Sequence, residues 1–163
     1  MVKRSAKQLD SSGRRRWLSR LQNDVVRTAA GQNNRITVLI DTNVWYSAIF
    51  YGGQPEKVVR YCLKSCELIT SEYLLDELLG LFKEHKAPYK WRNTVEKSLK
   101  QNCQIVEPIN LPVRSRDPKD DPIIAAALVG SCDFLVTGDE DLLSLGKIDQ
   151  VHIVSGKDFM ELF

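Results

Sequence analysis

The sequence contains very little histidine and no long apolar segment, and both scarcities limit what the protein does. His85 and His152 are the only histidines among 163 residues, so histidine-based catalysis has little to work with. No stretch approaches the roughly 20 apolar residues that a membrane helix requires. The N-terminus also lacks the apolar segment of a secretory signal. We therefore expect a cytoplasmic protein that has no membrane partner.

Cysteine is present, but not in a pattern typical of metal binding. The four cysteines lie at positions 62, 66, 103 and 132, and no two of them form a C-x-x-C pair. This spacing gives little support to a zinc site. It favours free, mostly buried thiols in a reducing compartment.

Charge is distributed unevenly along a chain whose overall composition is ordinary. The content of 43% apolar and 27% charged residues is typical of one soluble globular domain. Residues 1–35 hold nine Lys/Arg and two Asp, a net charge of +7, whereas residues 36–163 hold fourteen Lys/Arg and nineteen Asp/Glu, a net charge of −5. We therefore predict a basic N-terminal arm, 1–35, and an acidic domain, 36–163, and we expect the arm to meet an anion.

The basic arm contains a predicted helix from residue 14 to about residue 30. Its arginines are suited to binding the phosphates of a nucleic acid, and its tryptophan is suited to stacking on a base. The alternative is a helix that docks its apolar stripe on the domain or on a second subunit. The candidate nucleic-acid-binding residues of the arm are Arg14, Arg15, Arg16, Trp17 and Arg20.

Beyond the arm, short apolar runs alternate with helical patterns. The run 36–40 is almost continuously apolar, as in a strand that is buried on both faces. Such alternation predicts a parallel sheet covered by helices on both faces. Strands are predicted at 36–40, 68–70, 104–106, 134–137 and 151–154, and helices at 44–50, from 55, from 72, 91–101, from 122, after 139 and at 157–163.

Three aspartates lie where this fold brings strand ends and helix starts to one edge of the sheet. Asp41 closes the first strand, Asp121 opens the helical run 122–128, and Asp139 follows the strand 134–137. Carboxylates that converge at such an edge repel each other unless a cation joins them, so the pattern favours a divalent metal. Each aspartate also has a structural alternative as a turn residue or a helix cap.

A fourth acid, Glu77, lies at an unusual position on its predicted helix. It falls between Tyr73 and Leu81 at the edge of the apolar face. We expect a carboxylate there to lose hydration, which is costly without a partner such as a metal or a reacting group. The alternative is an edge glutamate that reaches solvent.

With these residues in view, the chain resembles the PIN-domain nucleases, and most of all the bacterial branch that comprises toxin components of toxin–antitoxin pairs. The resemblance covers residues 36–163 and lies in segments 38–44, 74–78, 116–122 and 135–142. It implies a three-layer α/β/α fold and a metal-dependent endonuclease, usually one that acts on RNA. It also implies a homodimer and an antitoxin partner. The chain departs from the short toxin-like members in its N-terminal arm, which has no counterpart in them. The family's acidic cluster falls on Asp41, Glu77, Asp121 and Asp139, with supporting positions at Asn43, Thr137 and Asp141.

The implied chemistry uses one or two Mg²⁺ or Mn²⁺ ions at this cluster. All four acids, Asp41, Glu77, Asp121 and Asp139, are candidate catalytic residues and metal ligands. Among them, Asp41 and Asp121 are expected to bind metal directly, Asp139 directly or through water, and Glu77 to hold or deprotonate the attacking water. Alternatives are an RNA-processing nuclease without an antitoxin and a catalytically silent RNA-binding module. A phosphatase with Asp41 as nucleophile is disfavoured, because Asn43 stands where such enzymes need a second aspartate.

Overall fold

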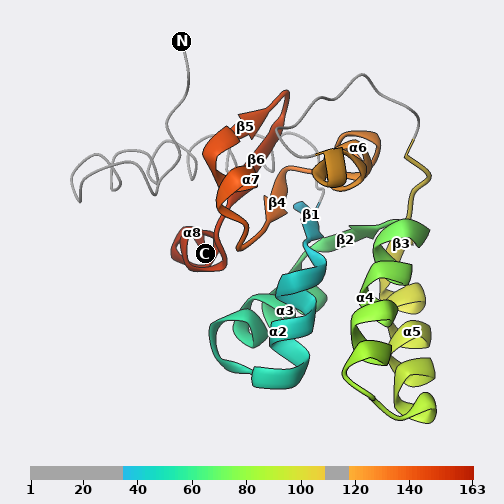
Figure 1. Cartoon of the computed structure of the whole chain (residues 1–163). Helices are drawn as coiled ribbons and strands as arrows, with labels where there is room; N and C mark the ends of the chain where they lie inside the picture. The colour runs from blue at the N-terminus through green and yellow to red at the C-terminus, as the bar shows by residue number, and fades with distance from the viewer. Residues whose placement is uncertain (1–34, 109–117) are drawn as a thin grey trace.

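A six-stranded sheet forms the centre of the molecule. The computed structural model describes residues 35–108 and 118–163 (Figure 1). The predicted arm therefore lies outside the described residues, except for its last residue, Arg35. The strand order is β3-β2-β1-β4-β6-β5. The strands are β1 (Thr37–Ile40), β2 (Glu67–Thr70), β3 (Cys103–Ile105), β4 (Phe134–Val136), β5 (Lys147–Ile148) and β6 (Val151–Val154).

Five of these strands run parallel, which confirms the predicted mainly parallel sheet. The central strand β1 pairs with β2 on one side and β4 on the other, so that Val38 faces both Leu68 and Phe134. The exception is β5, which pairs antiparallel with β6 at the edge of the sheet. Strand β5 was not predicted, because a strand of two residues is too short to show an alternating pattern.

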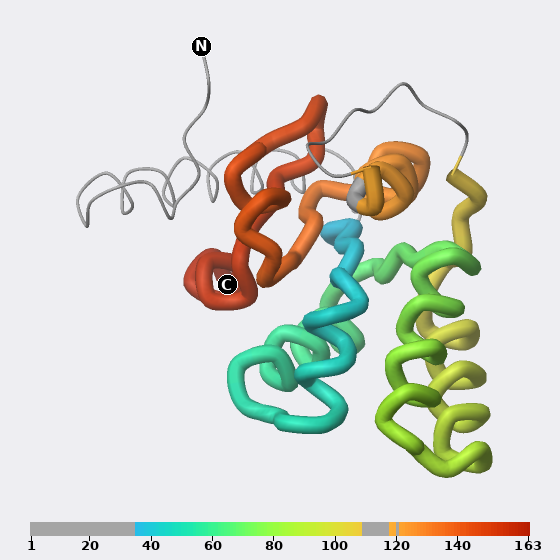
Figure 2. Tube along the Cα trace, in the orientation of Figure 1, coloured from blue at the N-terminus to red at the C-terminus, as the bar shows by residue number. Residues whose placement is uncertain are grey.

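Helices cover both faces of the sheet, as expected for a three-layer α/β/α fold (Figures 1 and 2). Val38 and Ile40 belong to a core with α2, α3, α4, α5 and α8. The residue between them, Leu39, belongs to a second core with α6 and α7, because successive strand side chains point to opposite faces. The helices are α2 (Thr42–Tyr51), α3 (Gly53–Ser65), α4 (Glu72–Glu84), α5 (Tyr89–Asn102), α6 (Asp121–Val129), α7 (Glu140–Leu145) and α8 (Gly156–Leu162), and a 3-10 turn spans Pro118–Asp120.

The ends of the helices follow local chemistry more closely than they follow the apolar pattern. Ser71 caps α4 as predicted, accepting a hydrogen bond from the Leu74 amide at 3.3 Å. Helix α2 begins two residues before the predicted start, because its first turn is built from the polar residues Thr42 and Asn43. The turn between α2 and α3 has φ of +68° and +70° at Gly52 and Gly53, a region that favours glycine.

All four cysteines are buried and free, which confirms the predicted thiols. Burial raises the pKa of Cys103 to about 12, and burial together with the nearby Asp133 charge raises that of Cys132 to about 12. Both thiols are therefore protonated at neutral pH and are poor nucleophiles. None of the described helices is long and apolar enough to cross a membrane.

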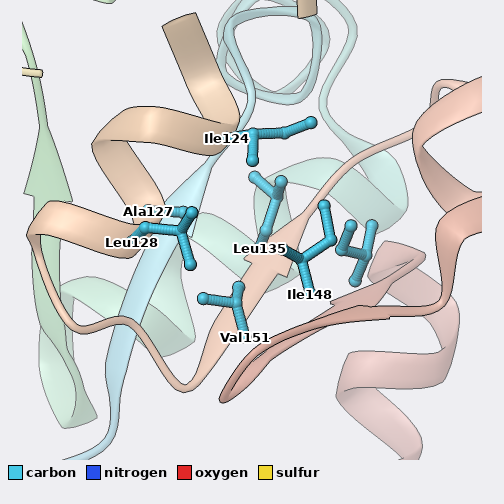
Figure 3. Close-up of a pocket in the computed structure, with 7 residues that line it drawn as sticks. Ile124, Ala127, Leu128, Leu135, Ile148 and Val151 are labelled. Atoms are coloured by element: carbon cyan, nitrogen blue, oxygen red, sulfur yellow. The ribbon is translucent and has the colours of Figure 1, made fainter. Parts of the chain in front are cut away.

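A narrow apolar gap lies between α6, β4 and the β5–β6 hairpin (Figure 3). Its lining is aliphatic and includes Ile124, Leu135, Ile148 and Val151. No polar side chain lines it, and it is too narrow for a water molecule. It is a packing gap in the second core.

Candidate functional site at the acidic edge of the sheet

Asp41 lies at the point where the strand order reverses. The chain proceeds from β1 outward to β2 and β3, and it then returns to place β4 on the other side of β1. The Asp41 amide donates to the Val136 carbonyl at 2.9 Å, so its backbone is tied to the end of β4. Ligand sites of open α/β sheets form at such a reversal, beyond the carboxyl ends of the strands.

The Asp41 carboxylate is buried, with 6% of the residue exposed, and two threonine hydroxyls hold it. The Thr137 hydroxyl donates to Oδ2 at 2.6 Å, and the Thr42 hydroxyl contacts Oδ1 at 3.3 Å. Asp41 immediately precedes α2, and its side chain makes no regular capping hydrogen bond, although the Asn43 backbone amide interacts with the carboxylate. A helix cap alone does not require the contacts of this carboxylate with the two threonine hydroxyls.

The pKa of Asp41 is raised above its ordinary value. Burial is the largest cause, and the negative charge of Asp139 adds to it. The Thr137 hydroxyl, the Asn43 backbone amide and the Thr42 hydroxyl oppose the shift. Ionised Asp41 is thus under-solvated in the fold, and a bound cation would relieve this cost.

Thr42 is a site residue that the sequence analysis did not single out. Its hydroxyl donates to Glu77 Oε2 at 2.9 Å in addition to its contact with Asp41. One side chain therefore links two predicted site acids that lie 36 positions apart in the sequence. Its position directly after Asp41 was the available signal, but a threonine there is equally typical of helix initiation.

Glu77 is exposed, so the expectation that it loses hydration is wrong. Helix α4 turns Leu74, Leu78 and Phe82 into the core, and Glu77 faces the solvent-accessible side of the acidic edge. Its hydrogen bond to Thr42 nevertheless places it beside Asp41. A glutamate in contact with both water and the site is better suited to proton transfer than to deep metal ligation.

Thr137 links Asp41 to Asp139, on the side of Asp41 opposite to its contact with Thr42. The Thr137 side chain is fully buried, and its oxygen accepts from the Asp139 amide at 3.0 Å while its hydroxyl donates to Asp41. Asp139 Oδ1 accepts from the amides of Asp141 and Leu142 at 2.7 and 3.4 Å, so this residue also caps α7. Of the other supporting positions, Asn43 and Asp141 both have exposed side chains.

Asp121 shares this edge by topology. It is the first residue of α6, which connects β3 to β4, and a helix that joins two parallel strands runs antiparallel to them. Its N-terminus therefore lies at the edge where the strands end. The hydrogen bonds above join Asp41, Glu77 and Asp139, whereas Asp121 is placed with them by the order of the elements. Within residues 35–108 and 118–163, no three His, Cys, Asp or Glu side chains converge closely enough to hold a metal by themselves.

A mainly parallel sheet between two helical layers, with a buried aspartate at its topological reversal, defines an α/β/α protein with an acidic ligand-binding edge. The family model of the PIN domain matches residues 37–141. The chain therefore belongs to the PIN domain family, as the four acidic segments of the sequence indicated.

A solved structure shares this fold. It is a chain of VapBC2 from Rickettsia felis, in a crystal structure of that complex bound to a DNA fragment from its promoter. The two chains are 15% identical and superpose with a TM-score of 0.51, over 74% of this chain and 98% of the other. No curated protein matches the chain.

Replacement of Thr42 tests whether its hydroxyl links the two acids. We expect Thr42→Val to raise the Asp41 pKa further, because the Thr42 hydroxyl lowers it. The free energy of unfolding should fall by only about 0.5–1.5 kcal/mol, since Glu77 remains hydrated after losing this bond. The measurements are an NMR titration of the Asp41 carboxyl carbon and urea unfolding. In Thr42→Ser, which keeps the hydroxyl, Asp41 should titrate as in the wild type. An unchanged Asp41 pKa in Thr42→Val would show that the Thr42 hydroxyl does not influence this carboxylate.

Proposed function

We propose that this chain is a divalent-metal-dependent endoribonuclease whose reaction centre is the acidic edge of the sheet. The observation that carries the proposal is the network Glu77–Thr42–Asp41–Thr137–Asp139. It places a buried carboxylate of raised pKa between an exposed glutamate and a second aspartate. Membership of the PIN domain family and the resemblance to its nucleases support the activity and the RNA substrate.

The donor chemistry of the site fits a hard divalent cation. Carboxylate oxygens are the ligands that Mg²⁺ prefers, and Mg²⁺ keeps several waters when few carboxylates reach it. In this site the acids are joined through threonines and do not form a tight triad of ligands. Such an arrangement suits an ion that keeps several of its water ligands. We propose that Asp41, Asp121 and Asp139 hold the ion. When bound, such an ion lowers the pKa of a water molecule and stabilises negative charge on a phosphate.

The side chains of the chain would then divide the remaining tasks. Glu77, exposed and oriented by Thr42, would accept the proton of the attacking water. Thr137 would keep the Asp41 carboxylate in one orientation, because its hydroxyl oxygen is itself held by a hydrogen bond that it accepts from the Asp139 amide. At two of the supporting positions the backbone amide is the interacting group. The Asn43 amide bonds to the Asp41 carboxylate, and the Asp141 amide donates to Asp139 Oδ1.

Within this class, we propose that the chain is the toxin of a toxin–antitoxin pair and forms a homodimer. The resemblance of the four acidic segments favours this role, and the likeness in fold to a chain of VapBC2 is compatible with a two-component assembly. An RNA-processing nuclease without an antitoxin is the second candidate. A short antitoxin reading frame beside the gene would separate the two.

The activity is tested by incubating the full-length chain with a mixed-sequence single-stranded RNA and Mg²⁺ or Mn²⁺. We expect cleavage with metal and none with EDTA, because the ion supplies the activated water. A rise in melting temperature with added metal provides a readout that is independent of activity, since a ligand that binds the folded state stabilises it. Full cleavage in EDTA would contradict the metal-dependent scheme, whereas RNA binding without cleavage would favour a silent binding module.

A further inference from the structure

The turn between α4 and α5 carries a positive patch on an acidic domain. We call residues 83–92 the hairpin tip. The tip holds four Lys/Arg and one acid, a net charge of +3, whereas residues 36–163 as a whole have a net charge of −5. Its exposed cations are Lys83, Lys86 and Lys90, with Arg92 partly exposed beside them. Such a local reversal of sign is the charge pattern expected where an acidic protein meets a polyanion.

Aromatic rings lie among these cations and face solvent. Tyr89 is 73% exposed and Trp91 is 36% exposed. The Trp91 ring contacts Phe82 and Phe50 at angles of 59° and 67°, with centroid distances of 5.1 and 5.4 Å, so its position is fixed by packing. The Arg92 guanidinium lies over the Tyr89 ring at 5.8 Å. Exposed rings interleaved with cations are typical of platforms on which single-stranded bases stack.

Hydrogen bonds hold the backbone of the tip in one conformation. Lys86 has φ of +57° and donates its amide to the Lys83 carbonyl at 3.0 Å. The Ala87 amide donates to the Phe82 carbonyl at 2.9 Å, which closes the end of α4 in a Schellman-type turn. Pro88 then fixes the start of α5 and accepts from the Trp91 amide. The cations therefore project from a pre-organised loop, which reduces the entropy cost of binding.

The tip and the acidic edge both lie along α2 and α4. Thr42, at the start of α2, bonds to Glu77 near the middle of α4. Further along both helices, rings of α2 contact the end of α4, with Tyr46–His85 at 5.1 Å and Phe50–Phe82 at 5.4 Å. Figure 1 shows α2 and the α4–α5 hairpin extending away from the sheet on the same side. The rise of a helix places the tip roughly 10 Å beyond Glu77.

We propose that the hairpin tip is a second binding surface for single-stranded RNA, on which Tyr89 and Trp91 stack bases while Lys86 and Lys90 contact phosphates. This inference rests on the proposed function for the identity of the nucleic acid. Charge complementarity and exposed rings select a single strand as the occupant, because duplex bases offer no free face for stacking. An RNA held by the tip thus runs along α2 and α4 to the acidic edge.

Binding of a labelled single-stranded RNA oligonucleotide to the full-length chain tests the proposal. The titrations are done in EDTA, so that no cleavage occurs, and at several salt concentrations. We expect Tyr89→Ala to raise the Kd about tenfold, the effect typical of losing one stacked base. The double variant Lys86→Glu/Lys90→Glu should make the salt dependence shallower by about 1.4 in log–log slope, because each lost phosphate contact removes about 0.7.

Two exposed positions elsewhere provide matched controls. Lys157→Glu reverses an exposed charge on α8, and Leu63→Ala removes an exposed apolar side chain from α3. Both controls should bind RNA like the wild type. The three tip residues that are changed are themselves exposed, so the variants should melt at the wild-type temperature. Every variant retains the N-terminal arm, whose contribution to affinity therefore cancels in the comparison.

The outcomes separate this inference from the proposed function. Wild-type affinity and slope in both tip variants would overturn the inference, whether or not the chain cleaves RNA. Weaker binding by the tip variants of a chain that never cleaves would support the inference and contradict the proposed function. A tip variant that changes the molecular mass of the protein in solution, with RNA affinity intact, would identify the tip as a protein interface and would also overturn the inference.

Discussion

Asp41→Asn should abolish metal-dependent RNA cleavage and leave the fold at least as stable as the wild type at neutral pH. The amide keeps the shape of the carboxylate but removes the charge at the centre of the network. Loss of an indirect partner of a metal site typically costs about 10- to 100-fold in activity, so loss of Asp41, which we propose as a direct ligand, should cost at least a hundredfold. The measurement is the single-turnover cleavage rate in Mg²⁺ compared with that of the wild type.

The stability half of this prediction follows from the raised pKa of Asp41. An aspartate in an unfolded chain titrates near 3.9. Because the folded-state pKa is higher, the folded chain binds this proton more tightly, and the wild type loses stability as the pH rises from about 4 through the folded pKa. The asparagine variant lacks this loss. The unfolding free energy of Asp41→Asn minus that of the wild type should therefore be larger at pH 7 than at pH 4. Urea unfolding of both proteins at the two pH values measures this difference.

A variant that is both inactive and much less stable than the wild type would contradict this account of Asp41. It would indicate that the carboxylate is a structural group whose loss disturbs the ends of β1 and β4. Added Mg²⁺ provides the matching control. It should raise the melting temperature of the wild type more than that of Asp41→Asn, because the variant binds the ion more weakly.

Thr137→Val is expected to cost roughly 2–6 kcal/mol of unfolding free energy. Valine has nearly the shape of threonine, but it leaves Asp41 Oδ2 and the Asp139 amide without their hydroxyl partner. Each buried polar group that loses its partner costs about 1–3 kcal/mol. The Asp41 pKa should also rise further, since the Thr137 hydroxyl is the strongest influence that lowers it. Urea unfolding and an NMR titration of Asp41 measure the two effects.

The conservative variant Thr137→Ser separates the hydroxyl from the methyl group. Serine retains the donor and the acceptor and should recover most of the stability and the wild-type titration of Asp41. Equal losses in the valine and serine variants would show that packing of the methyl group, rather than hydrogen bonding, makes Thr137 important. RNA cleavage should follow the hydroxyl in the same way.

The sequence allowed the sheet to be predicted because its central strands are buried on both faces. The continuous apolar run that ends at Ile40 reflects two cores, one on each side of β1. The helix starts were predicted less accurately, because Thr42 and Tyr89 begin their helices without apolar periodicity. The strand β5 was missed because two residues carry no pattern. This short edge strand is defined by its antiparallel pairing with β6, a tertiary contact.

The acidic edge was predictable from chain order, but the contacts that connect it were not. Strand ends and helix starts placed Asp41 and Asp139 together, and hydrogen bonds through Thr137 join them. The error concerned Glu77, whose position on a helical wheel does not reveal that this side of α4 is open to solvent. The bridging role of Thr42 depends on how α2 and α4 pack together, a tertiary fact that sequence spacing does not contain.

The pairing of β1 with β4 has a consequence for the order of events during synthesis. Asp41 and Thr137 are 96 positions apart, and β4 is the strand that completes the surroundings of Asp41. A chain grows from its N-terminus at about 5–20 residues per second. A nascent chain that has reached only residue 108 contains Asp41 and Glu77 but lacks β4 and everything that β4 positions. The surroundings of Asp41 are therefore completed only after β4 has been synthesised, and a chain that stops before β4 has the first acids of the edge without the strand that holds Asp41 in place.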